Sequence, residues 1–419
     1  MKSVGCRTNQ SELDSITRSL DEIGLTQCQD FHEADFSIIN TCAVTRESEK
    51  KSLDIIRRVW NAGNSFLLLT GCCVEAGTSE LPEDSNRVKL FSNSAKGLIV
   101  DEVLKIASVR EYAGSKRSAP DHAKSTHLHS RPIIKIQEGC SCFCSYCVVP
   151  FLRGAPRSIG YDDIKKEIER SIFEFPCEIV LTGTNIGLFR DPAFGLGLAQ
   201  LMQRILEEFP HVYIRLSSIE LNDIDDELIR LFEHDRIRNH LHIPLQSASD
   251  FVLVRMGRNY SYENYRRRVL ELKKLIPGIG ITTDVMVGFP GESDEDFEMT
   301  CRAVAELKFL KIHVFRYSTR AGTRAARFDG QIPEGVKSRR SRQLINMGEE
   351  IGLNCKRRFL GQILSCTAEK RLKDEVYLGT SQNYIKLLIR GNNIKEGMVL
   401  NCLVKKEEGD RFVADFVDE

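Results

Sequence analysis

The sequence predicts an α/β protein with three parts: a small N-terminal α/β domain, a central partial (β/α)6 barrel, and a small antiparallel β-barrel at the C-terminal end. Two series of short apolar runs alternating with amphipathic stretches predict the first two parts, and closely spaced strands and turns predict the third. A length of 419 residues suits two or three domains, and a hydrophobic content of 42% lets each domain bury a core. Disordered and collagen-like proteins are therefore excluded.

Charge and cysteine content narrow the class further. Lys+Arg 59 and Asp+Glu 59 give a formal net charge of +0, which argues against holding nucleic acid by bulk electrostatics but leaves room for a local basic face. The N-terminus has no apolar signal segment, and the longest apolar runs, such as Phe66 to Leu69, are too short to span a bilayer. We therefore expect a cytoplasmic protein with no membrane association, in which clustered members of the 14 cysteines bind metal rather than form disulfides.

The N-terminal domain is expected over residues 1–109. Ser11 is placed to cap a helix that ends at Gly24, because apolar residues recur between them at helical spacing. The apolar runs Phe36 to Asn40 and Phe66 to Thr70 predict buried parallel strands with a helix between them.

Three cysteines of this domain follow strand ends. Cys42 and Cys72 follow the two apolar runs, and Cys6 lies where another strand end is expected. Because the carboxyl ends of parallel strands meet at one edge of an open α/β sheet, the three can meet there.

A polar stretch from about Arg110 to Ser130 is interpreted as a linker. The central domain is expected over residues 126–355, with amphipathic helices between six strands. This length suits a partial barrel with an open side, because a closed eightfold barrel takes about 250 residues. The expected strands are Pro132 to Gln137, Glu178 to Thr182, Val212 to Ser217, His240 to Leu245, Ile281 to Val287 and Lys311 to Arg316.

The C-terminal part begins after a long polar helix with basic runs at Lys337 to Arg342 and Lys356 to Arg358. Residues 359–419 then show five short strands separated by turns, which predict a small antiparallel barrel. Barrels of this kind often bind oligonucleotides. A β-module that only packs against the central barrel is the alternative, and the mixed charge of this segment leaves both open.

Four cysteines crowd into the segment GCSCFCSYC, directly after the first expected barrel strand. Cys140, Cys144 and Cys147 have the spacing C-x3-C-x2-C, which suits an iron–sulfur cluster with one open iron. A tetrahedral zinc site with Cys142 as fourth ligand is the alternative. The isolated cysteines are expected to pack in cores as small apolar residues: Cys28, Cys177, Cys301, Cys355, Cys366 and Cys402.

This motif at the start of a βα barrel resembles the radical S-adenosylmethionine superfamily. In that superfamily the open iron of a 4Fe-4S cluster binds S-adenosylmethionine, and one electron cleaves it to methionine and a 5′-deoxyadenosyl radical. The resemblance implies that Cys140, Cys144 and Cys147 are ligands, that Cys142 is not, and that Tyr146 lies by the cofactor adenine.

Segments along nearly the whole chain resemble the methylthiotransferases, which join an N-terminal cluster domain, a radical barrel and a C-terminal TRAM domain. The resemblance implies a second 4Fe-4S cluster on Cys6, Cys42 and Cys72, with Cys73 beside the last ligand. In that family one S-adenosylmethionine methylates a sulfur on the second cluster and another becomes the radical, so we assign no catalytic side chain. The segments are VGCRTNQSE (4 to 12), INTCAVT (39 to 45), LTGC (69 to 72), GCSCFCSYCVVPFLRGAPRS (139 to 158), VLTGTNIG (180 to 187), RLSSIE (215 to 220), HIPLQSAS (242 to 249), VGFPGE (287 to 292) and FRYSTRAGTRAA (315 to 326).

Contacts to S-adenosylmethionine are expected at the carboxyl ends of the barrel strands, where such sites collect. Thr182 and Gly183 end the second strand, Ser217 the third, and Gln246 the fourth. The segment Val287 to Glu292 resembles the part of the superfamily that flanks the adenine, although ordinary turn chemistry also explains its glycines.

Three further polar residues receive an interpretation. His242 lies on an apolar strand and is interpreted as a hydrogen-bonded core histidine. Arg153 and Arg157 follow the cysteine motif and match the family's RG..RS segment, and we expect them to face either substrate phosphates or the barrel surface.

The resemblance also separates substrates, because family members modify an adenosine beside the tRNA anticodon or an aspartate of a ribosomal protein. NTCAVTRESEKKS, HVFRYSTRAGT and Asn383-Tyr384 resemble the branch that acts on N6-threonylcarbamoyladenosine. The isopentenyladenosine and ribosomal-protein branches are alternatives, and a zinc-dependent RNA-binding module is a third. The expected partners are tRNA and a low-potential electron donor such as flavodoxin or ferredoxin, with no stable protein partner.

Overall fold

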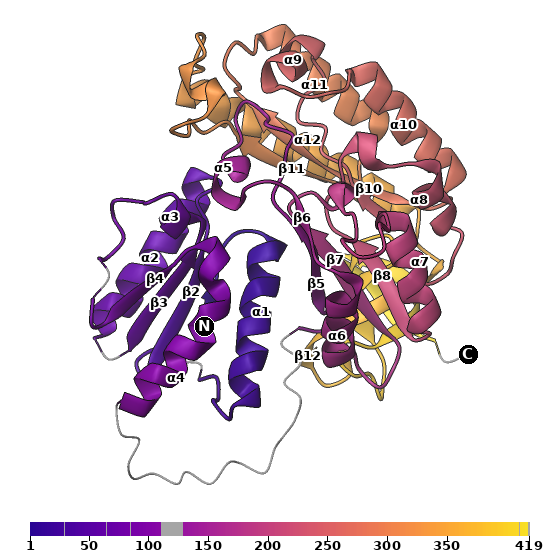
Figure 1. The fold of residues 1–419 in the computed structure, drawn as a ribbon. Coiled ribbons are helices and arrows are strands. Elements are labelled where there is room, and N and C mark those ends of the chain that lie inside the picture. Colours follow the sequence, from indigo (N-terminus) through magenta and orange to yellow (C-terminus); the bar gives the residue numbers. More distant parts are fainter. Residues whose placement is uncertain (29, 64, 84, 110–128, 410, 418–419) are drawn as a thin grey trace. The chain divides into compact units, whose positions relative to one another are not determined.

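The computed structural model describes residues 1–28, 30–63, 65–83, 85–109, 129–409 and 411–417. Two compact units make up the chain (Figure 1): Met1–Leu128 with Val148–Ala155, and His129–Cys147 with Pro156–Glu419. The expected linker falls almost entirely outside the described residues. Among the described helices, none has the length and apolar character needed to cross a bilayer. The boundaries 1–109, 126–355 and 359–419 stay a prediction.

A four-stranded parallel sheet forms the centre of the N-terminal unit, in the order β1-β2-β3-β4. Strands β2 (Phe36–Thr41) and β3 (Phe66–Gly71) match the predicted runs, whereas β4 (Val88–Phe91) was not predicted. Strand β1 (Lys2–Ser3) is very short and pairs with β2. The helices of this unit are α1 (Arg7–Glu22), α2 (Arg46–Ala62), α3 (Cys72–Glu75), the 3-10 helix η1 (Asn93–Leu98), α4 (Ile99–Val109) and α5 (Val149–Arg153).

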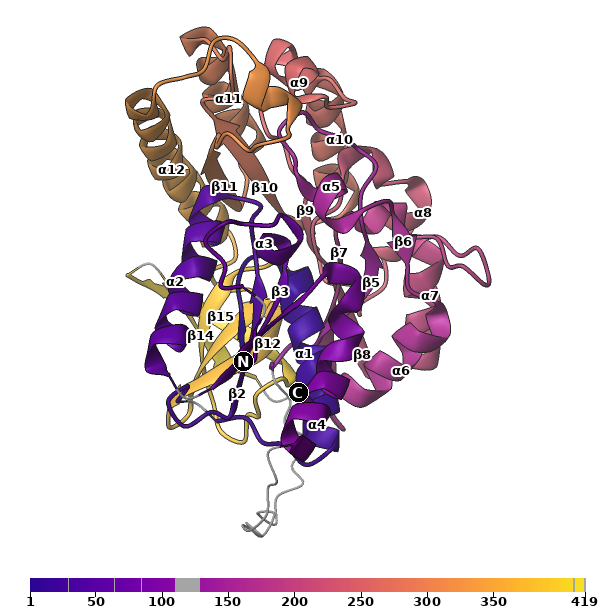
Figure 2. The ribbon, with the colours of Figure 1, turned by 60° about the vertical axis from the view of Figure 1, so that its left-hand side comes forward.

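Helices cover both faces of this sheet (Figure 2). Alternate residues of β3 point to opposite faces, so Leu68 packs with α1 and α4 while Leu67 and Leu69 pack with α2. Helix α1 begins at Arg7, four residues before the predicted cap Ser11, because the chain turns into the helix directly after the extended Cys6. The predicted start was therefore wrong.

The second unit contains all six predicted barrel strands, arranged in two sheets of order β6-β5-β7-β8 and β11-β10-β9. Isolated parallel bridges from Ile214 to Ile237 and from Ser218 to His242 join the sheets. The short strand β6 (Arg157–Ser158) pairs antiparallel with β5 and was not predicted. The six strands are β5 (Ile133–Glu138), β7 (Cys177–Gly183), β8 (Val212–Leu216), β9 (His240–His242), β10 (Gly280–Val287) and β11 (Lys311–Arg316).

Helices pack on the outer face of these strands and leave the inner face polar. On β7, Ile179 and Leu181 belong to the helix-packed core, so Glu178 and Thr182 face the barrel interior. The helices are α6 (Tyr161–Ser171), α7 (Leu198–Glu208), α8 (Asp226–Leu231), α9 (Asp250–Met256), α10 (Tyr262–Leu275), α11 (Asp294–Leu307) and α12 (Glu334–Arg357), with 3-10 turns η2 (Ile186–Leu188), η3 (Leu221–Asp223) and η4 (Arg324–Arg327).

The C-terminal strands close into a five-stranded barrel in the order β12-β13-β14-β16-β15. The predicted barrel is confirmed, and all its strand pairs but one are antiparallel as expected. The exception is the parallel pair of β14 and β16. The strands are β12 (Ile363–Lys373), β13 (Val376–Ser381), β14 (Lys386–Arg390), β15 (Val399–Glu408) and β16 (Arg411–Phe416).

A buried ion network joins this barrel to the larger one within the second unit. Glu178 accepts hydrogen bonds from Arg215 Nε at 2.6 Å and from Arg238 Nε at 2.7 Å. Thr367 of β12 donates to the same carboxylate at 3.0 Å, and Arg131 lies 3.3 Å from it. The two barrels therefore meet at a buried cluster of charged side chains.

The isolated cysteines follow the prediction with one exception. Cys28 is exposed, in the loop after α1, where its Sγ lies 3.2 Å from the Asp30 carbonyl oxygen, so its assignment to the core was wrong. Cys301 is partly buried. The four buried members are Cys177, Cys355, Cys366 and Cys402.

Candidate functional site

Three cysteines of the N-terminal unit follow the carboxyl ends of three neighbouring strands. Cys6 comes shortly after β1, and Cys42 and Cys72 come directly after β2 and β3. Because these strands are adjacent and parallel, their carboxyl ends share one sheet edge. Gly5 permits the close approach: its φ is +97°, and a Cβ there would lie 2.5 Å from the Cys42 Sγ. The three cysteines share this edge, and their role as ligands stays a prediction.

The three thiols are also electrostatic neighbours. The pKa of the Cys42 thiol is raised to about 11, first by burial and further by the Cys72 and Cys6 thiols. Burial likewise raises the pKa of Cys72, while the Arg153 cation acts in the opposite direction. Thiols with raised pKa values are protonated at neutral pH, so a metal that binds here displaces protons.

The donor set at this edge fits an iron–sulfur cluster, because cysteine thiolates are the usual ligands of such clusters. Within the described ranges, no three His, Cys, Asp or Glu side chains already stand in metal-ligating geometry. The fit therefore rests on the donor chemistry and the shared edge. Cys73 is buried, and its Sγ lies 3.3 Å from the Cys42 carbonyl oxygen. That contact directs the Cys73 thiol to backbone, which favours Cys72 as the third ligand.

The second cysteine set lies in the loop between β5 and α5. Cys140, Cys144 and Cys147 are partly exposed, as ligands of a group that reacts with a small molecule must be. Ser145 anchors the loop: its N–H donates to the Met256 carbonyl at 2.8 Å, and its hydroxyl donates to the Arg255 carbonyl at 2.8 Å. These bonds fix the loop against the end of α9.

Cys142 has partners of its own in this loop. Its backbone N–H lies 3.5 Å from the Cys140 Sγ, and Asn185 Nδ2 lies 3.6 Å from its thiol. The pKa of the Cys142 thiol is raised, chiefly by its hydrogen bond with Cys140. The exclusion of Cys142 from the ligand set stays a prediction.

Arg258 contacts this cysteine set and was not found from the sequence. Its Nη1 lies 3.6 Å from the Cys144 Sγ and 3.2 Å from the Glu220 carboxylate, and its Nη2 also pairs with Glu220. The Arg258 side chain is only 4% exposed. A guanidinium N–H beside a thiolate stabilises the charged form. No motif in the sequence pointed to this residue, which directly follows Gly257, the glycine that ends helix α9.

The residues predicted to bind S-adenosylmethionine lie at the carboxyl ends of barrel strands. Thr182 and Gly183 end β7, and a Cβ on Gly183 would lie 2.8 Å from the Gln137 carbonyl oxygen. Ser217 is buried, and its hydroxyl has no hydrogen-bond partner in the described part of the chain. Buried hydroxyls are normally paired, so this one fits a bound polar ligand.

Tyr146 and Gln246 complete the predicted set. The Tyr146 ring is partly buried and meets Phe289 edge-on, with ring centroids 6.3 Å apart. Gln246 has a φ of +61°, a strained value for a residue with a side chain, and its backbone bonds to Asp284 and Met286 hold it there. Strained backbone of this kind is common at ligand sites, and all five contacts stay predictions.

The segment Val287 to Glu292 folds back on itself. Glu292 accepts hydrogen bonds from the Gly288 N–H at 2.6 Å and from Arg340 Nη1 at 2.6 Å. Burial raises the pKa of Glu292 to about 7 although Arg340 opposes this. Gly288 has a φ of +71°, and a Cβ there would lie 2.3 Å from the Lys337 side chain. This segment is therefore packed tightly against α12.

Two sequence interpretations change with the structure. Arg153 faces neither phosphates nor the barrel surface: its side chain is 3% exposed and pairs with Glu12 inside the N-terminal unit. Arg157 is 63% exposed, as expected for a surface residue. His242 is partly exposed rather than core, and it is hydrogen-bonded, with Nδ1 2.9 Å from Thr282 Oγ1 and Nε2 3.2 Å from the Asp284 carboxylate.

Family models match both parts of the chain that contain a cysteine set. Residues 134–304 match the Radical SAM superfamily, and residues 1–92 match the Uncharacterized protein family UPF0004. A relative named threonylcarbamoyladenosine tRNA methylthiotransferase MtaB, from Thermotoga maritima, is 33% identical over 98% of this chain and 95% of its own length. The chain belongs to the methylthiotransferase family of radical S-adenosylmethionine enzymes.

Other members of the methylthiotransferase family are similar over the same length. The Bacillus subtilis protein named MtaB is 32% identical, covering 96% of this chain and 93% of its own. A tRNA-2-methylthio-N(6)-dimethylallyladenosine synthase of Endomicrobium trichonymphae is 29% identical, covering 100% and 99%. Among solved structures, the radical S-adenosylmethionine methyltransferase TsrM from Kitasatospora setae has a TM-score of 0.51 and 14% identity, covering 73% of this chain and 71% of its own. That likeness shows the fold alone.

Membership in this family means that the protein is a methylthiotransferase that uses S-adenosylmethionine and 4Fe-4S chemistry. The sequence resemblance to the family is thereby confirmed.

Proposed function

We propose that this enzyme adds a methylthio group to carbon 2 of the adenine in N6-threonylcarbamoyladenosine, beside the anticodon of tRNA. One observation carries the proposal: the match to relatives named for this substrate runs through both domains that contain cysteine triads. The triads are Cys6, Cys42 and Cys72 in the first unit, and Cys140, Cys144 and Cys147 in the second.

Two 4Fe-4S clusters and two S-adenosylmethionine molecules, when bound, supply a radical that removes hydrogen and a sulfur donor. The chain holds the thiolates and shapes the cofactor pocket. Thr182 and Gly183 offer backbone groups at the end of β7, and the Ser217 hydroxyl, which has no partner among the described residues, offers a hydrogen bond. Tyr146 offers an aromatic face at the end of the cysteine loop.

The polar inner face of the barrel supports a nucleoside substrate. His242 on β9 bonds to Thr282 and Asp284 on β10, and its ring centroid lies 5.7 Å from that of His313 on β11. These side chains alternate with residues that pack against the helices, so they point into the barrel. Imidazole and carboxylate groups can donate to and accept from the edges of a base.

Contact with the rest of the tRNA is proposed to run through basic residues of the second unit and through the C-terminal barrel. Exposed Arg339 and Arg342 on α12 line a surface hollow of about 440 Å³ together with Ser338, Gln343 and Asn346. Guanidinium and amide groups along one helix face suit phosphate oxygens. A low-potential flavodoxin or ferredoxin is the proposed electron donor.

Expression in a Bacillus subtilis strain that lacks its own MtaB protein tests this proposal. Mass spectrometry of tRNA nucleosides should then show 2-methylthio-N6-threonylcarbamoyladenosine restored. A variant with Cys144→Ala is the matched control and should restore none. Absence of the product with the intact, expressed chain refutes the substrate assignment.

The isopentenyladenosine relative is similar over the whole chain, so that nucleoside is the second candidate substrate. The same mass spectra, from a strain that lacks both methylthiotransferases, separate the two. Metal analysis of the anaerobically purified protein addresses the zinc alternative: iron and sulfide are expected, and stoichiometric zinc without iron–sulfur absorption refutes the radical chemistry.

A further inference from the structure

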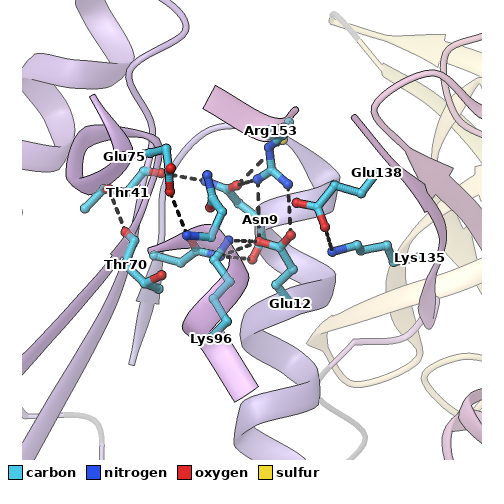
Figure 3. Close-up of polar contacts among 12 residues, drawn as sticks. Asn9, Glu12, Thr41, Thr70, Glu75, Lys96, Lys135, Glu138 and Arg153 are labelled. Atoms are coloured by element: carbon cyan, nitrogen blue, oxygen red, sulfur yellow. Dashed lines mark hydrogen bonds and ion pairs between the residues drawn. The ribbon is translucent and has the colours of Figure 1, made fainter. Parts of the chain in front are cut away.

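Figure 3 shows a buried charge cluster of the N-terminal unit that contains Asn9, Glu12, Lys96 and Arg153. Arg153 Nη1 donates to Glu12 Oε1 at 2.9 Å, and Arg153 Nη2 pairs with the Asn9 side-chain oxygen. Lys96 Nζ pairs with the other Glu12 oxygen, to which Asn40 Nδ2 also donates at 3.1 Å. The Arg153, Glu12 and Lys96 side chains are 3%, 6% and 10% exposed.

The cluster is connected by hydrogen bonds to the backbone that bears the cysteines. Asn9 Nδ2 donates to the Val4 and Thr41 carbonyls, each at 2.8 Å, and these residues stand two before Cys6 and one before Cys42. Through its own amide group, Asn9 therefore ties the ends of β1 and β2 together.

The third cysteine position is tied to the same network through Thr41. Its hydroxyl donates to the Thr70 carbonyl at 2.6 Å and accepts from the Cys73 N–H at 3.1 Å, on either side of Cys72. In Figure 3 Thr41 and Thr70 lie beside the cluster of Asn9, Glu12, Lys96 and Arg153. One chain of contacts thus runs from the Arg153 guanidinium to all three cysteine-bearing turns.

Two cations of this cluster, Arg153 and Lys96, pair with the same Glu12 carboxylate, and all three side chains are buried. The Asn9 side-chain oxygen that Arg153 contacts also lies 4.0 Å from the Cys6 Sγ, so a single side chain separates the guanidinium from that cysteine. An iron–sulfur cluster on three thiolates is anionic, and nearby positive charge makes its reduction easier.

Arg153 also connects the two cysteine sets along the chain. It follows Cys147 by six residues, and its segment, Val148–Ala155, folds as part of the N-terminal unit. Leu152 in that segment accepts a hydrogen bond from Asn93 Nδ2 at 2.8 Å, which is a second anchor. The chain that leaves Cys147 is therefore held by the unit that contains Cys6, Cys42 and Cys72.

We propose that Arg153 is a positioning residue for a cluster bound by Cys6, Cys42 and Cys72: it orders the three cysteine turns through Asn9 and supplies positive charge that sets the reduction potential of that cluster. The proposal rests on the proposed function, since it requires a cluster on this cysteine set. It assigns to Arg153 a role that a purely structural ion pair would not have.

The test uses the full chain with Cys140, Cys144 and Cys147 changed to Ala, so that any remaining cluster belongs to the other set. After anaerobic reconstitution, electron paramagnetic resonance during a redox titration gives the midpoint potential and line shape. Arg153→Gln should move the midpoint to a more negative potential, and Arg153→Lys should keep it near the parent value with an altered line shape. Arg157→Gln, at an exposed guanidinium nearby in sequence, is the control and should change neither.

An Arg153→Gln protein with the parent's midpoint and line shape overturns the proposal. Should that variant fail to fold, as judged by circular dichroism, Lys96→Met takes its place, with the same negative shift expected and an unchanged midpoint again contradicting the role of the charge cluster. A parent protein that binds no cluster contradicts the proposed function as well. A parent protein whose cluster keeps the same midpoint potential after Arg153→Gln and after Lys96→Met contradicts this inference alone.

Discussion

Replacement of Glu178 by Gln should strongly destabilise the second unit while leaving the first unit unchanged. The Glu178 side chain is fully buried and accepts from Arg215 at 2.6 and 3.1 Å and from Arg238 at 2.7 Å. Arg131 and Thr367 contact the same carboxylate. A Gln side chain keeps the shape but removes the negative charge that these guanidiniums share, and only Arg131 keeps a second carboxylate, Glu369 at 2.7 Å, among the described residues. Breaking a buried ion pair from one side costs about 3–5 kcal/mol, so we expect a loss of that size.

The units can be followed separately in urea. Trp60, the single tryptophan, lies on α2 in the first unit, so its fluorescence reports the unfolding of that unit. Far-UV circular dichroism also contains the helices of the second unit. Glu178→Gln should lower the free energy of unfolding in the dichroism transition and leave the Trp60 transition in place.

Glu208→Gln is the matched control for this experiment. Glu208 pairs with Lys165 at 2.7 Å and Arg204 at 3.1 Å but is 28% exposed, so its loss should cost about 0–1 kcal/mol. A Glu178→Gln protein that unfolds within about 1 kcal/mol of the parent would refute the reasoning, since the buried guanidiniums would then need no counter-charge.

The pH dependence follows from the pKa of Glu178. Burial alone would raise this pKa, but the Arg215, Arg238 and Arg131 cations outweigh it and hold the pKa well below its usual range. A carboxyl with a depressed folded pKa contributes stability above its unfolded pKa, about 4.3, and loses it as the pH falls toward the folded value. The difference between parent and variant should therefore stay constant near neutral pH and shrink only in acid.

Three further substitutions test the site. Cys42→Ala should abolish thiolation but leave S-adenosylmethionine cleavage, measured as 5′-deoxyadenosine release; full thiolation would remove Cys42 from the ligand set. Arg258→Gln removes the guanidinium cation beside Cys144. In protein with Cys6, Cys42 and Cys72 changed to Ala, the midpoint potential of a cluster on the remaining cysteine set should therefore become more negative. An unchanged midpoint potential would contradict the role of this contact. Glu292→Gln removes one of the two carboxylates that pair with Arg340, the other being Asp294 at 2.7 Å, and should cost about 1–3 kcal/mol by urea unfolding. An unchanged free energy of unfolding would show that the Glu292–Arg340 pair is dispensable.

Regular elements of the fold could be predicted because their signals are local. The apolar runs Phe66 to Thr70 and Lys311 to Arg316 became β3 and β11, and the turn-separated segments after Gln362 became the closed barrel. Strand β4 (Val88–Phe91) was missed because its run is short and only partly buried. Helix α1 was started late because its first turn is polar, and the extended Cys6 rather than a capping side chain ends the preceding loop.

The cysteine sets were also predictable, since spacing and strand ends both point to them. Cys140, Cys144 and Cys147 lie within a single loop, and Cys42 and Cys72 each follow a recognisable strand. Cys28 shows the limit of this reasoning: a lone cysteine in a mixed segment carries no sign of burial, and it proved to be exposed.

Buried arginines were not predictable, because a guanidinium has the same sequence pattern inside a protein as on its surface. Arg153 pairs with Glu12 across 141 residues, Arg258 with Glu220 across 38, and Arg215 with Glu178 across 37. Burying such a pair costs desolvation that its attraction barely repays, so stability alone does not account for it. What each pair does provide is a fixed position: the first beside the N-terminal cysteine edge, the second beside Cys144, the third where the two barrels of the second unit join. The sequence predicts which cysteines hold a cluster, whereas the ion pairs beside these two cysteine sets emerge only from the folded chain.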